Sequence, residues 1–460
     1  MDLSAANTSL WNIVIQFGII AMALLVATFL RRKVAGIAKS LMPTAVLAGF
    51  LLLILRSVGI LQLDTNLLEQ MTYHGIAIGF IAMALRVPPE KTSEEKGGMT
   101  ALKTGALIVS TYLMQAVVGF AITLGLAYTC MPGLFKAAGI LLPMGYGQGP
   151  GQANNVGTTY EALGFTGGRS FALAIAAAGF LCACVIGVIY LNILNRKGKL
   201  NKKAHDEISG SVTVDAFQDQ NEIPIAESVD RFSMQFALVI IVYLFTYLAT
   251  LGITNGLAAI SPGLANSVSS ILWGFNFIIG SALGMLLRVI MKKLRSAKIM
   301  TRQYQNNYLL NRISGLAFDL MIVAGIASIN IGDLTGLWVP FILMAVAGGA
   351  VTLVYLCWLC KRLYPHYYYE GMLSMYGMMT GTISSGILLL REIDPEFDTP
   401  AANNLVTGSG TGILFGVPML IFISMAAKSD QMLFITIGAV LVYWALLLLF
   451  ILKVKRKAKK

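Results

Sequence analysis

Charged residues are scarce in this sequence. Asp, Glu, Lys and Arg together make up 12% of its 460 residues, whereas an average soluble domain contains about 25%. Hydrophobic residues make up 57%, and the mean hydropathy is +0.74. Apolar runs of about 20 residues, the length that crosses a hydrocarbon core, recur along the chain. This composition excludes a soluble globular protein and indicates an all-α, polytopic membrane protein.

Side chains suited to metal binding or nucleophilic catalysis are also few. The sequence has three scattered histidines and five cysteines, two of which form a CxxC at 357–360. A zinc site would need two more soft ligands nearby, so we expect free thiols. The sequence lacks HExxH, a Ser/His pair at matching depth and paired intramembrane aspartates. We therefore expect neither a membrane-embedded enzyme nor an organic cofactor, and the absence of an ATP-binding motif argues against a primary pump.

The net charge of +12 comes from 34 Lys and Arg residues against 22 Asp and Glu residues. The basic residues form short clusters between apolar runs, so we expect them to set membrane topology rather than bind nucleic acid. If the polar, glycine-rich stretches 137–165 and 366–391 each return to their side of entry, 30 of the 34 basic residues lie in the cytoplasm. If both stretches cross, only 16 do. Because cytoplasmic loops are enriched in Lys and Arg, the charges favour two re-entrant hairpins.

The resulting topology has about 11 crossings, with the N-terminus outside and the C-terminus in the cytoplasm. Arg56, Lys136, Arg169 and Lys428 are the basic residues predicted to lie outside. The predicted spans are residues 11–30, 40–60, 67–86, 102–128, 171–194, 232–252, 266–290, 308–329, 337–360, 404–426 and 431–452.

The order of these elements repeats once along the chain. Residues 1–194 hold five spans and the hairpin 137–165, and residues 232–428 hold five spans and the hairpin 366–391. A hydrophilic cytoplasmic linker, 195–231, joins the two repeats, and residues 429–460 add a further span with a basic tail. Because five crossings is an odd number, the second repeat is inverted. Inverted repeats with interrupted helices near the midplane characterise many secondary transporters.

The first predicted hairpin combines glycines with amide and hydroxyl side chains. Glycine permits positive φ and close backbone approach, and Pro150 removes a backbone donor. Such a break leaves backbone amides and carbonyls free to face a ligand. Helix N-termini favour anions, and hard cations favour oxygen ligands. Tight packing of small residues explains the glycines but not the Asn and Gln. The binding candidates are Gly147, Gln148, Gly149, Gln152, Asn154, Asn155, Thr158 and Thr159.

The second predicted hairpin and the start of the next span supply a matching polar group. Ser and Thr in membrane helices often bond only to their own backbone, so the cluster is more informative than any one member. The binding candidates are Tyr376, Thr380, Thr382, Ser384, Ser385, Asn403 and Asn404.

Asp319 is the one carboxylate well inside a predicted span. Intramembrane acids are costly and are functional hypotheses by default, so we predict a role in cation coupling or gating. The alternative is a structural partner for a donor such as His74. The candidate ligands for a coupling sodium ion are Asn154, Asp319 and Thr382.

The sequence resembles the bacterial sodium/glutamate symporters of the glutamate:sodium symporter family over nearly its whole length. The resemblance rests on two inverted halves, a glycine-rich hairpin in each, and PMGYGQGPGQANN where that family carries a Gly-Gly-His-Gly-Thr type sequence. MYGMMTGTISSG lacks the fuller glycine repeat of the family. The resemblance implies a multi-pass protein of the cell (plasma or inner) membrane that takes up glutamate or a related acidic amino acid with sodium. It also implies a homodimer and elevator-like movement of both hairpins. The alternatives are a cation- or proton-coupled transporter of another small organic anion, and a passive channel.

Overall fold

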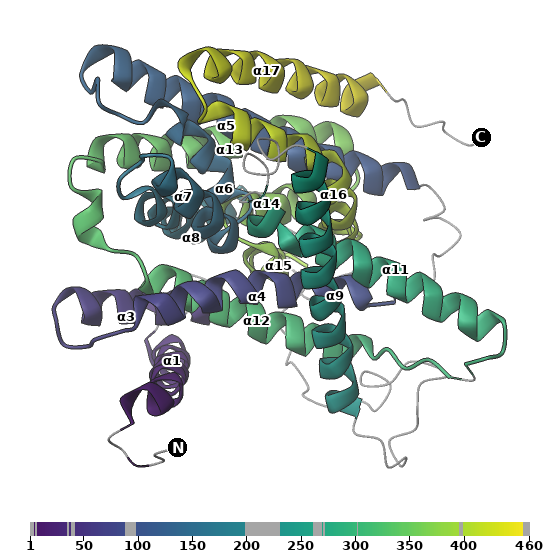
Figure 1. Ribbon diagram of the computed structural model, residues 1–460. Coiled ribbons are helices and arrows are strands. Elements are labelled where there is room, and N and C mark those ends of the chain that lie inside the picture. Colours follow the sequence, from purple (N-terminus) through teal and green to yellow (C-terminus); the bar gives the residue numbers. More distant parts are fainter. Residues whose placement is uncertain are drawn as a thin grey trace. The chain divides into compact units, whose positions relative to one another are not determined.

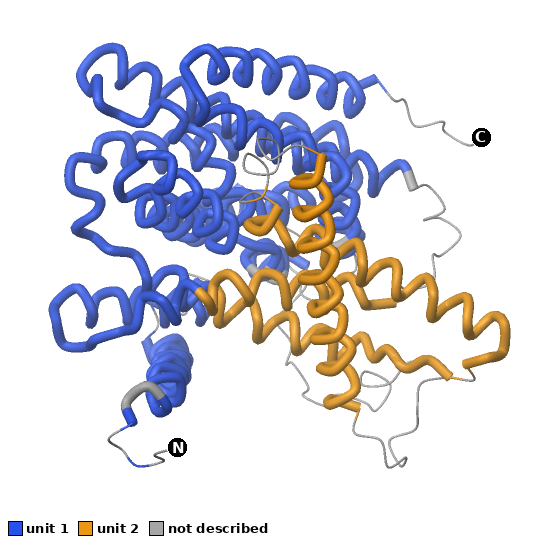
Figure 2. The backbone as a smooth tube through the Cα atoms, viewed as in Figure 1, with its two compact units in different colours: residues 1–69, 97–201, 322–460 blue, residues 70–96, 202–321 orange. Residues whose placement is uncertain are grey.

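The structure of the chain is a computed structural model. It describes residues 4, 7–34, 36–37, 42–87, 98–197, 231–260, 269, 272–300, 302–394 and 399–453, so most of the predicted linker and the basic tail lie outside the described residues. The regular elements of the described part are helices (Figure 1). The chain forms two compact units (Figure 2): unit 1 contains residues 1–69, 97–201 and 322–460, and unit 2 contains residues 70–96 and 202–321.

Eight of the described helices have the length and apolar composition needed to cross a membrane. They are α1 (Thr8–Lys33), α5 (Gly98–Thr129), α8 (Gly168–Arg196), α9 (Arg231–Ile260), α12 (Asn307–Ala327), α13 (Trp338–Leu363), α16 (Ala401–Ala426) and α17 (Asp430–Lys453). Helices suit this environment because a backbone in lipid must satisfy its own polar groups. Many of their large apolar side chains are exposed, as the prediction of a multi-pass membrane protein requires.

Three further predicted spans correspond to helices that are shorter or more polar: α3 (Thr44–Ser57), α4 (Thr65–Leu85) and α11 (Asn276–Ser296). α3 has only 14 residues, fewer than the ~20 that a straight span needs. α4 carries Glu69 and His74 in its first half, and the last turns of α11 carry four basic residues. A membrane crossing by these three helices therefore remains a prediction.

In unit 2, helices α4, α9 and α11 pack with the first part of α12 around one apolar core. The core residues are Ile81, Ala82, Leu85, Val239, Val242, Leu310 and Ile313. Asn307, at the start of α12, accepts from the N–H of Val87 and donates to its C=O, both at 2.8 Å. These bonds join the end of α4 to the start of α12.

In unit 1, each stretch predicted as a hairpin is a helical segment interrupted near its middle. The first interrupted segment (137–165) contains the end of η2 (Lys136–Ile140), α6 (Leu141–Tyr146) and α7 (Pro150–Ala162). The second interrupted segment (366–391) contains α14 (Tyr368–Thr380) and α15 (Ile383–Arg391). Helices α5, α8 and α13 each contact both segments.

Glycine explains the geometry of both interruptions. Gly149 has φ 81° and ψ −172°, a backbone conformation that is essentially restricted to glycine. Pro150 follows it as the first residue of α7, where its missing N–H has no cost. In the second segment, a Cβ on Gly377 would lie 2.8 Å from the Cα of Gly386, so glycine allows α14 and α15 to pack backbone against backbone.

Candidate functional site

The two interruptions touch each other inside unit 1. Gly149 is the N-cap of α7, and Thr382 is the N-cap of α15. A Cβ on Gly149 would lie 3.5 Å from Cγ2 of Thr382 and 3.6 Å from the carbonyl oxygen of Gly381. Helices α7 and α15 therefore begin side by side. We call this place the junction.

Both helix N-termini at the junction lack a capping side chain. Gly149 has none to offer, and the Thr382 hydroxyl makes no capping hydrogen bond. The first N–H groups of a helix have no partner within the helix, and together they carry a partial positive charge. Two such ends in contact favour a negatively charged group between them.

Each of the two helices also presents a buried polar side chain at its third position. Gln152 of α7 is 1% exposed and Ser385 of α15 is 3% exposed. The side-chain nitrogen and oxygen of Gln152 have no hydrogen-bond partner among the described residues. The hydroxyls of Thr382 and Ser385 have none there either. Leaving a buried polar group unpaired costs about 1–3 kcal/mol, and native proteins rarely do so. Several buried polar atoms without a hydrogen-bond partner thus lie together at the junction.

Gln115 of α5 adds another buried amide. Its Nε2 donates to the carbonyl oxygen of Met379 at 2.9 Å and to the hydroxyl of Thr352 at 3.0 Å, which fixes the side chain between α13 and the end of α14. Its Oε1 has no partner and lies 3.2 Å from the position of a Cβ on Gly147. Sequence reasoning missed Gln115, although an amide inside the apolar run 102–128 was a usable signal.

The groups that line the junction are neutral amides, hydroxyls, a carbonyl and two helix N-termini. Such a set is suited to a small anion at the amides, and its oxygens are suited to a hard cation. Among the described residues, no group of three or more His, Cys, Asp and Glu is placed to hold a metal ion. A cation bound here would therefore rely on neutral oxygen ligands.

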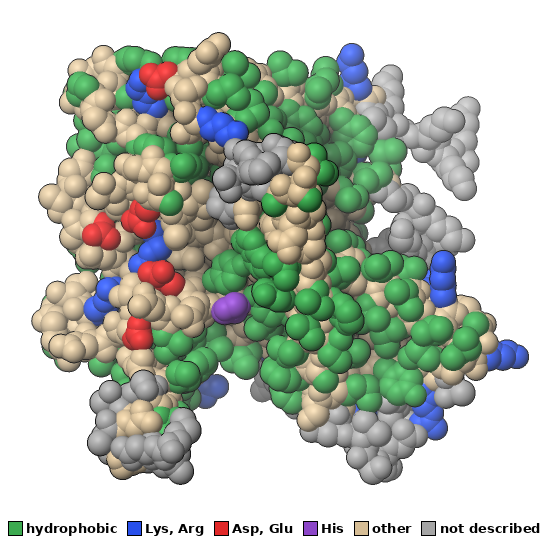
Figure 3. Space-filling view, viewed as in Figure 1, with side chains coloured by type: hydrophobic (Ala, Val, Ile, Leu, Met, Phe, Trp, Pro, Cys, Tyr) green, Lys and Arg blue, Asp and Glu red, His purple; other side chains and the backbone are tan. Residues whose placement is uncertain are grey.

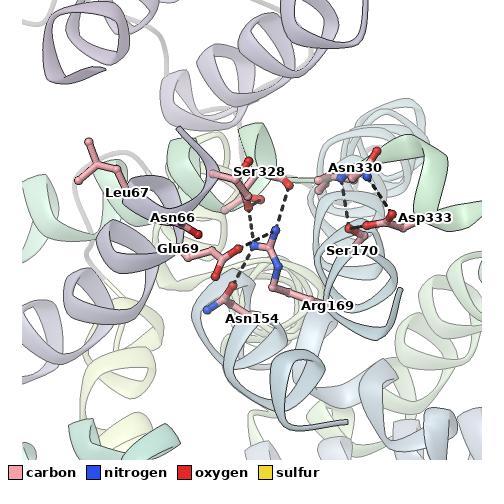
Figure 4. A network of polar contacts seen from close by, with 12 residues as sticks. Asn66, Leu67, Glu69, Asn154, Arg169, Ser170, Ser328, Asn330 and Asp333 are labelled. Atoms are coloured by element: carbon pink, nitrogen blue, oxygen red, sulfur yellow. Dashed lines mark hydrogen bonds and ion pairs between the residues drawn. The ribbon is translucent and has the colours of Figure 1, made fainter. Parts of the chain in front are cut away.

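Beside the junction, a buried arginine joins α7 to three other parts of unit 1 (Figure 4). Arg169, in the first turn of α8, is 7% exposed and pairs with the carboxylate of Glu69 at 3.1 Å. It donates to Oδ1 of Asn154 at 3.5 Å, and to the hydroxyl and the carbonyl oxygen of Ser328 at 3.3 and 3.4 Å. The candidate Asn154 therefore faces Arg169. The sequence revealed only the charge of Arg169, not these partners.

The next residue of α8 extends this polar network. The Ser170 hydroxyl donates to Oδ2 of Asp333 at 2.7 Å and accepts from the backbone N–H of Asn330 at 3.2 Å. The Asn330 side chain donates to Oδ1 of Asp333 at 2.8 Å. These bonds tie the start of α8 to the loop between α12 and α13 (Figure 4).

Other candidate residues of the two segments bond to neighbouring backbone. The hydroxyls of Thr159 and Thr380 donate to carbonyls one turn earlier in their own helices, at 2.9 and 2.8 Å. The Tyr376 hydroxyl donates to the carbonyl of Gly349 in α13 at 3.4 Å. Of the other candidates in these segments, Gln148 is half-buried, Asn155 is buried and Thr158 is exposed. The side chain of Ser384 lies outside the described residues.

The remaining candidates are Asn403 and Asn404, which lie away from the junction within unit 1, and Asp319, which belongs to unit 2. Asn404, in the first turn of α16 beside Asn403, donates to the Tyr367 hydroxyl at 2.8 Å. Tyr367 precedes α14, whose 13 residues separate it from the junction by about 20 Å of helix. Asp319 belongs to unit 2 and is exposed there. His74, its suggested partner, bonds instead to the Tyr243 hydroxyl at 2.7 Å.

A comparison of the chain with protein-family profiles, with curated proteins and with solved structures found no match. What the chain does is therefore inferred from its own residues and geometry. The junction is the part of unit 1 where unpartnered buried polar atoms from both segments come together.

Proposed function

We propose that the chain is a secondary active transporter that imports a small carboxylate, glutamate or a related acidic amino acid, together with sodium. The observation that carries this proposal is the contact between the N-termini of α7 and α15, each with a buried, unpartnered side chain at its third position. Interrupted helices whose N-termini point at an anionic substrate group are a recurring design of secondary transporters.

A carboxylate suits the donors at the junction. The Gln152 amide, the hydroxyls of Thr382 and Ser385, and the backbone N–H groups of two first turns all donate without carrying a full charge. Hydrogen bonds to an ionised acceptor are roughly twice as strong as neutral ones, and burial strengthens them further. A bound carboxylate would therefore satisfy groups that are unpaired in the chain alone.

Sodium suits the oxygens of the same region. Of the predicted sodium ligands, Thr382 lies in the junction, and the carbonyl of Gly381 and Oε1 of Gln115 are further neutral oxygens there. A cation next to a carboxylate lowers the cost of burying either charge. This mutual compensation is a physical basis for coupled entry of the two.

The proposed membrane arrangement has about eleven crossings and two inverted repeats, with both interrupted segments re-entrant. The matching roles of residues in the two segments support it: Gly149 and Thr382 are the N-caps, and Gln152 and Ser385 occupy the third helical position. Two half-helices related in this way are expected of inverted repeats.

The proposal is tested by transport into liposomes that contain the purified protein. We expect saturable uptake of labelled glutamate that requires an inward sodium gradient and reaches a higher concentration inside than outside. Gln152→Ala and Ser385→Ala should each raise KM about tenfold, because each removes a hydrogen bond to an ionised group, which is worth about 1.5 kcal/mol or more.

The matched control is Thr436→Val. Thr436 is also buried, but its hydroxyl donates to the Met432 carbonyl within α17 at 2.7 Å, so uptake should be unchanged. Uptake driven by a proton gradient without sodium would favour the alternative of proton coupling. If both junction variants transport like the control, the junction is not the binding site.

A further inference from the structure

Unit 2 brings the basic ends of several helices together. Arg86 directly follows α4, Arg231 begins α9, and Arg288 lies in the second half of α11. The Arg288 guanidinium donates to the carbonyl oxygens of Ala84 and Arg86 at 3.3 and 3.0 Å. The end of α4 is also bonded to Asn307 at the start of α12. One end of this helix bundle is thus strongly basic.

Acidic residues do not balance this charge in the described part of unit 2. Asp319 is the single acidic residue there. The basic residues of the same part are Arg86, Arg231, Arg288, Lys292, Lys293, Arg295, Lys298, Arg302 and Arg312. The described helix ends are therefore locally basic, although the full sequence of unit 2 contains 13 basic and 11 acidic residues; a local cluster of cations favours an anionic group beside it.

Arg86 and Arg288 form the centre of this basic end. Both are half-buried, and Nε of Arg86 has no hydrogen-bond partner among the described residues. No described acidic side chain forms an ion pair with either of them. A guanidinium that is partly withdrawn from water is unfavourable unless acceptors or an anion lie beside it. A planar guanidinium is well suited to bind phosphate oxygens.

The surface next to this pair changes from apolar to basic within about one turn of α11. Leu286, Val289 and Ile290 are exposed, and Lys292 and Lys293 follow them, also exposed. Figure 3 shows Lys and Arg side chains along the edge of a broad hydrophobic surface in the region of α11. An apolar surface that ends in a row of cations matches the boundary between acyl chains and anionic headgroups.

We propose that Arg86 and Arg288 bind the phosphate of an anionic phospholipid, whose acyl chains lie along the exposed apolar face of α11. Setting the membrane topology requires only that basic residues lie on the cytoplasmic side. It does not require two half-buried arginines in contact through a backbone carbonyl. The proposal does not depend on what the junction of unit 1 transports.

The test uses the purified full chain, stripped of lipid, with phosphatidylglycerol or phosphatidylcholine of identical acyl chains. Native mass spectrometry counts retained lipids, and thermal unfolding measures stabilisation. We expect phosphatidylglycerol to be retained and to raise Tm more than phosphatidylcholine. Arg86→Gln/Arg288→Gln should weaken phosphatidylglycerol binding about 25-fold, since each cation near the membrane surface contributes about fivefold. Inorganic phosphate without acyl chains should stabilise the chain much less.

The matched control, Lys361→Gln/Arg362→Gln, removes two exposed cations from the end of α13 in unit 1 and should leave phosphatidylglycerol binding unchanged. Arg86→Lys/Arg288→Lys keeps both charges and should retain most of it, which separates charge from a folding defect. Equal binding of the two lipids by the unmodified chain would overturn the proposal. So would equal losses in the two Gln double variants.

Discussion

At the scale of single residues, Arg169 shows how a cation is accommodated inside unit 1. Its guanidinium reaches Glu69, Asn154 and Ser328, which come from α4, α7 and the end of α12. A planar fork of five donors can serve several acceptors at once. This explains why an arginine, rather than a lysine, occupies the position.

We predict that the Arg169–Glu69 pair is energetically coupled. Arg169→Gln leaves Glu69 without its cation, and Glu69→Gln leaves a buried cation without its carboxylate, so each change should destabilise the fold. The double variant should be more stable than the sum of the single effects implies, by about 1–2 kcal/mol. This value lies below the 3–5 kcal/mol of a fully buried pair because the Glu69 side chain is 35% exposed and solvent screens the interaction.

The coupling is measured as the difference in unfolding free energy around the four-variant cycle in one detergent. Lys428→Gln provides a control, since Lys428 is an exposed cation of unit 1 outside this network. Strictly additive single effects would mean that the close approach of the two side chains has no energetic consequence.

Residue types alone identified part of the candidate site. Gln152, Thr382 and Ser385 could be proposed from the sequence because amides and hydroxyls beside a glycine-rich break are a local signal. Gln115 and Arg169 were not proposed, since their importance depends on partners from other helices, such as Met379 for Gln115 and Ser328 for Arg169. Asn403 and Asn404 share the local signal but lie at the other end of α14. Sequence proximity to a hairpin does not determine which end a side chain occupies.

At the scale of secondary-structure elements, the positions of the helix breaks could be predicted from the sequence more accurately than the bounds of the membrane spans. The breaks at residues 147–149 and 381–382 follow from glycine and proline, whose effect on the backbone is local. The described parts of the spans predicted at 40–60 and 266–290 form a 14-residue helix and an amphipathic helix with a basic end, so that their membrane crossing stays a prediction. Average hydropathy cannot reveal where a helix starts within an apolar run, because that depends on what the run packs against.

Helix α17, which follows the second predicted repeat, is joined by an ion pair to the residue that directly precedes the first interrupted segment. Lys136 at the start of η2 pairs with Asp430, the first residue of α17, and lies over the Tyr128 ring. The hydrogen bond to Asp430 raises the pKa of Lys136 above its ordinary value of 10.5. The stabilisation is therefore complete below pH 10.5 and is lost as the pH rises through the raised pKa.

We predict that Asp430→Asn lowers Tm slightly at pH 8, because an exposed pair contributes little. The difference from the unmodified chain should shrink as the pH rises through the raised pKa of Lys136, because the pair is lost when Lys136 loses its proton. Thermal unfolding at pH 8, 10 and 11.5 measures this trend. A difference that stays constant across the series would show that Asp430 acts through its helix N-terminus rather than through Lys136.

At the scale of the whole molecule, two groups of long-range contacts lie at opposite ends of α5 in unit 1. One group of contacts joins Lys136 to Asp430, near Lys428, and these cations are predicted to lie outside. Another joins Thr104 of α5 to Tyr364 after α13, hydroxyl to hydroxyl at 2.8 Å. The basic residues next to that second contact, Lys103 and Arg362, are predicted to lie in the cytoplasm. The loops that the charge count places on the same side are thus also the loops that contact one another.

The sidedness itself is testable with single cysteines. Lys428 and Arg362 are exposed at the ends of α16 and α13, so Lys428→Cys and Arg362→Cys place a thiol at each end of unit 1. The background needs Cys130→Ser, because Cys130 is the one exposed cysteine among those described. In intact cells, a membrane-impermeant maleimide should label Lys428→Cys and not Arg362→Cys, whereas opened membranes should allow both to react. The basic clusters set this orientation, since a Lys- and Arg-rich loop is retained in the cytoplasm. If both Lys428→Cys and Arg362→Cys are labelled in intact cells, the two interrupted segments do not both return to their side of entry, and the predicted inverted repeat is overturned.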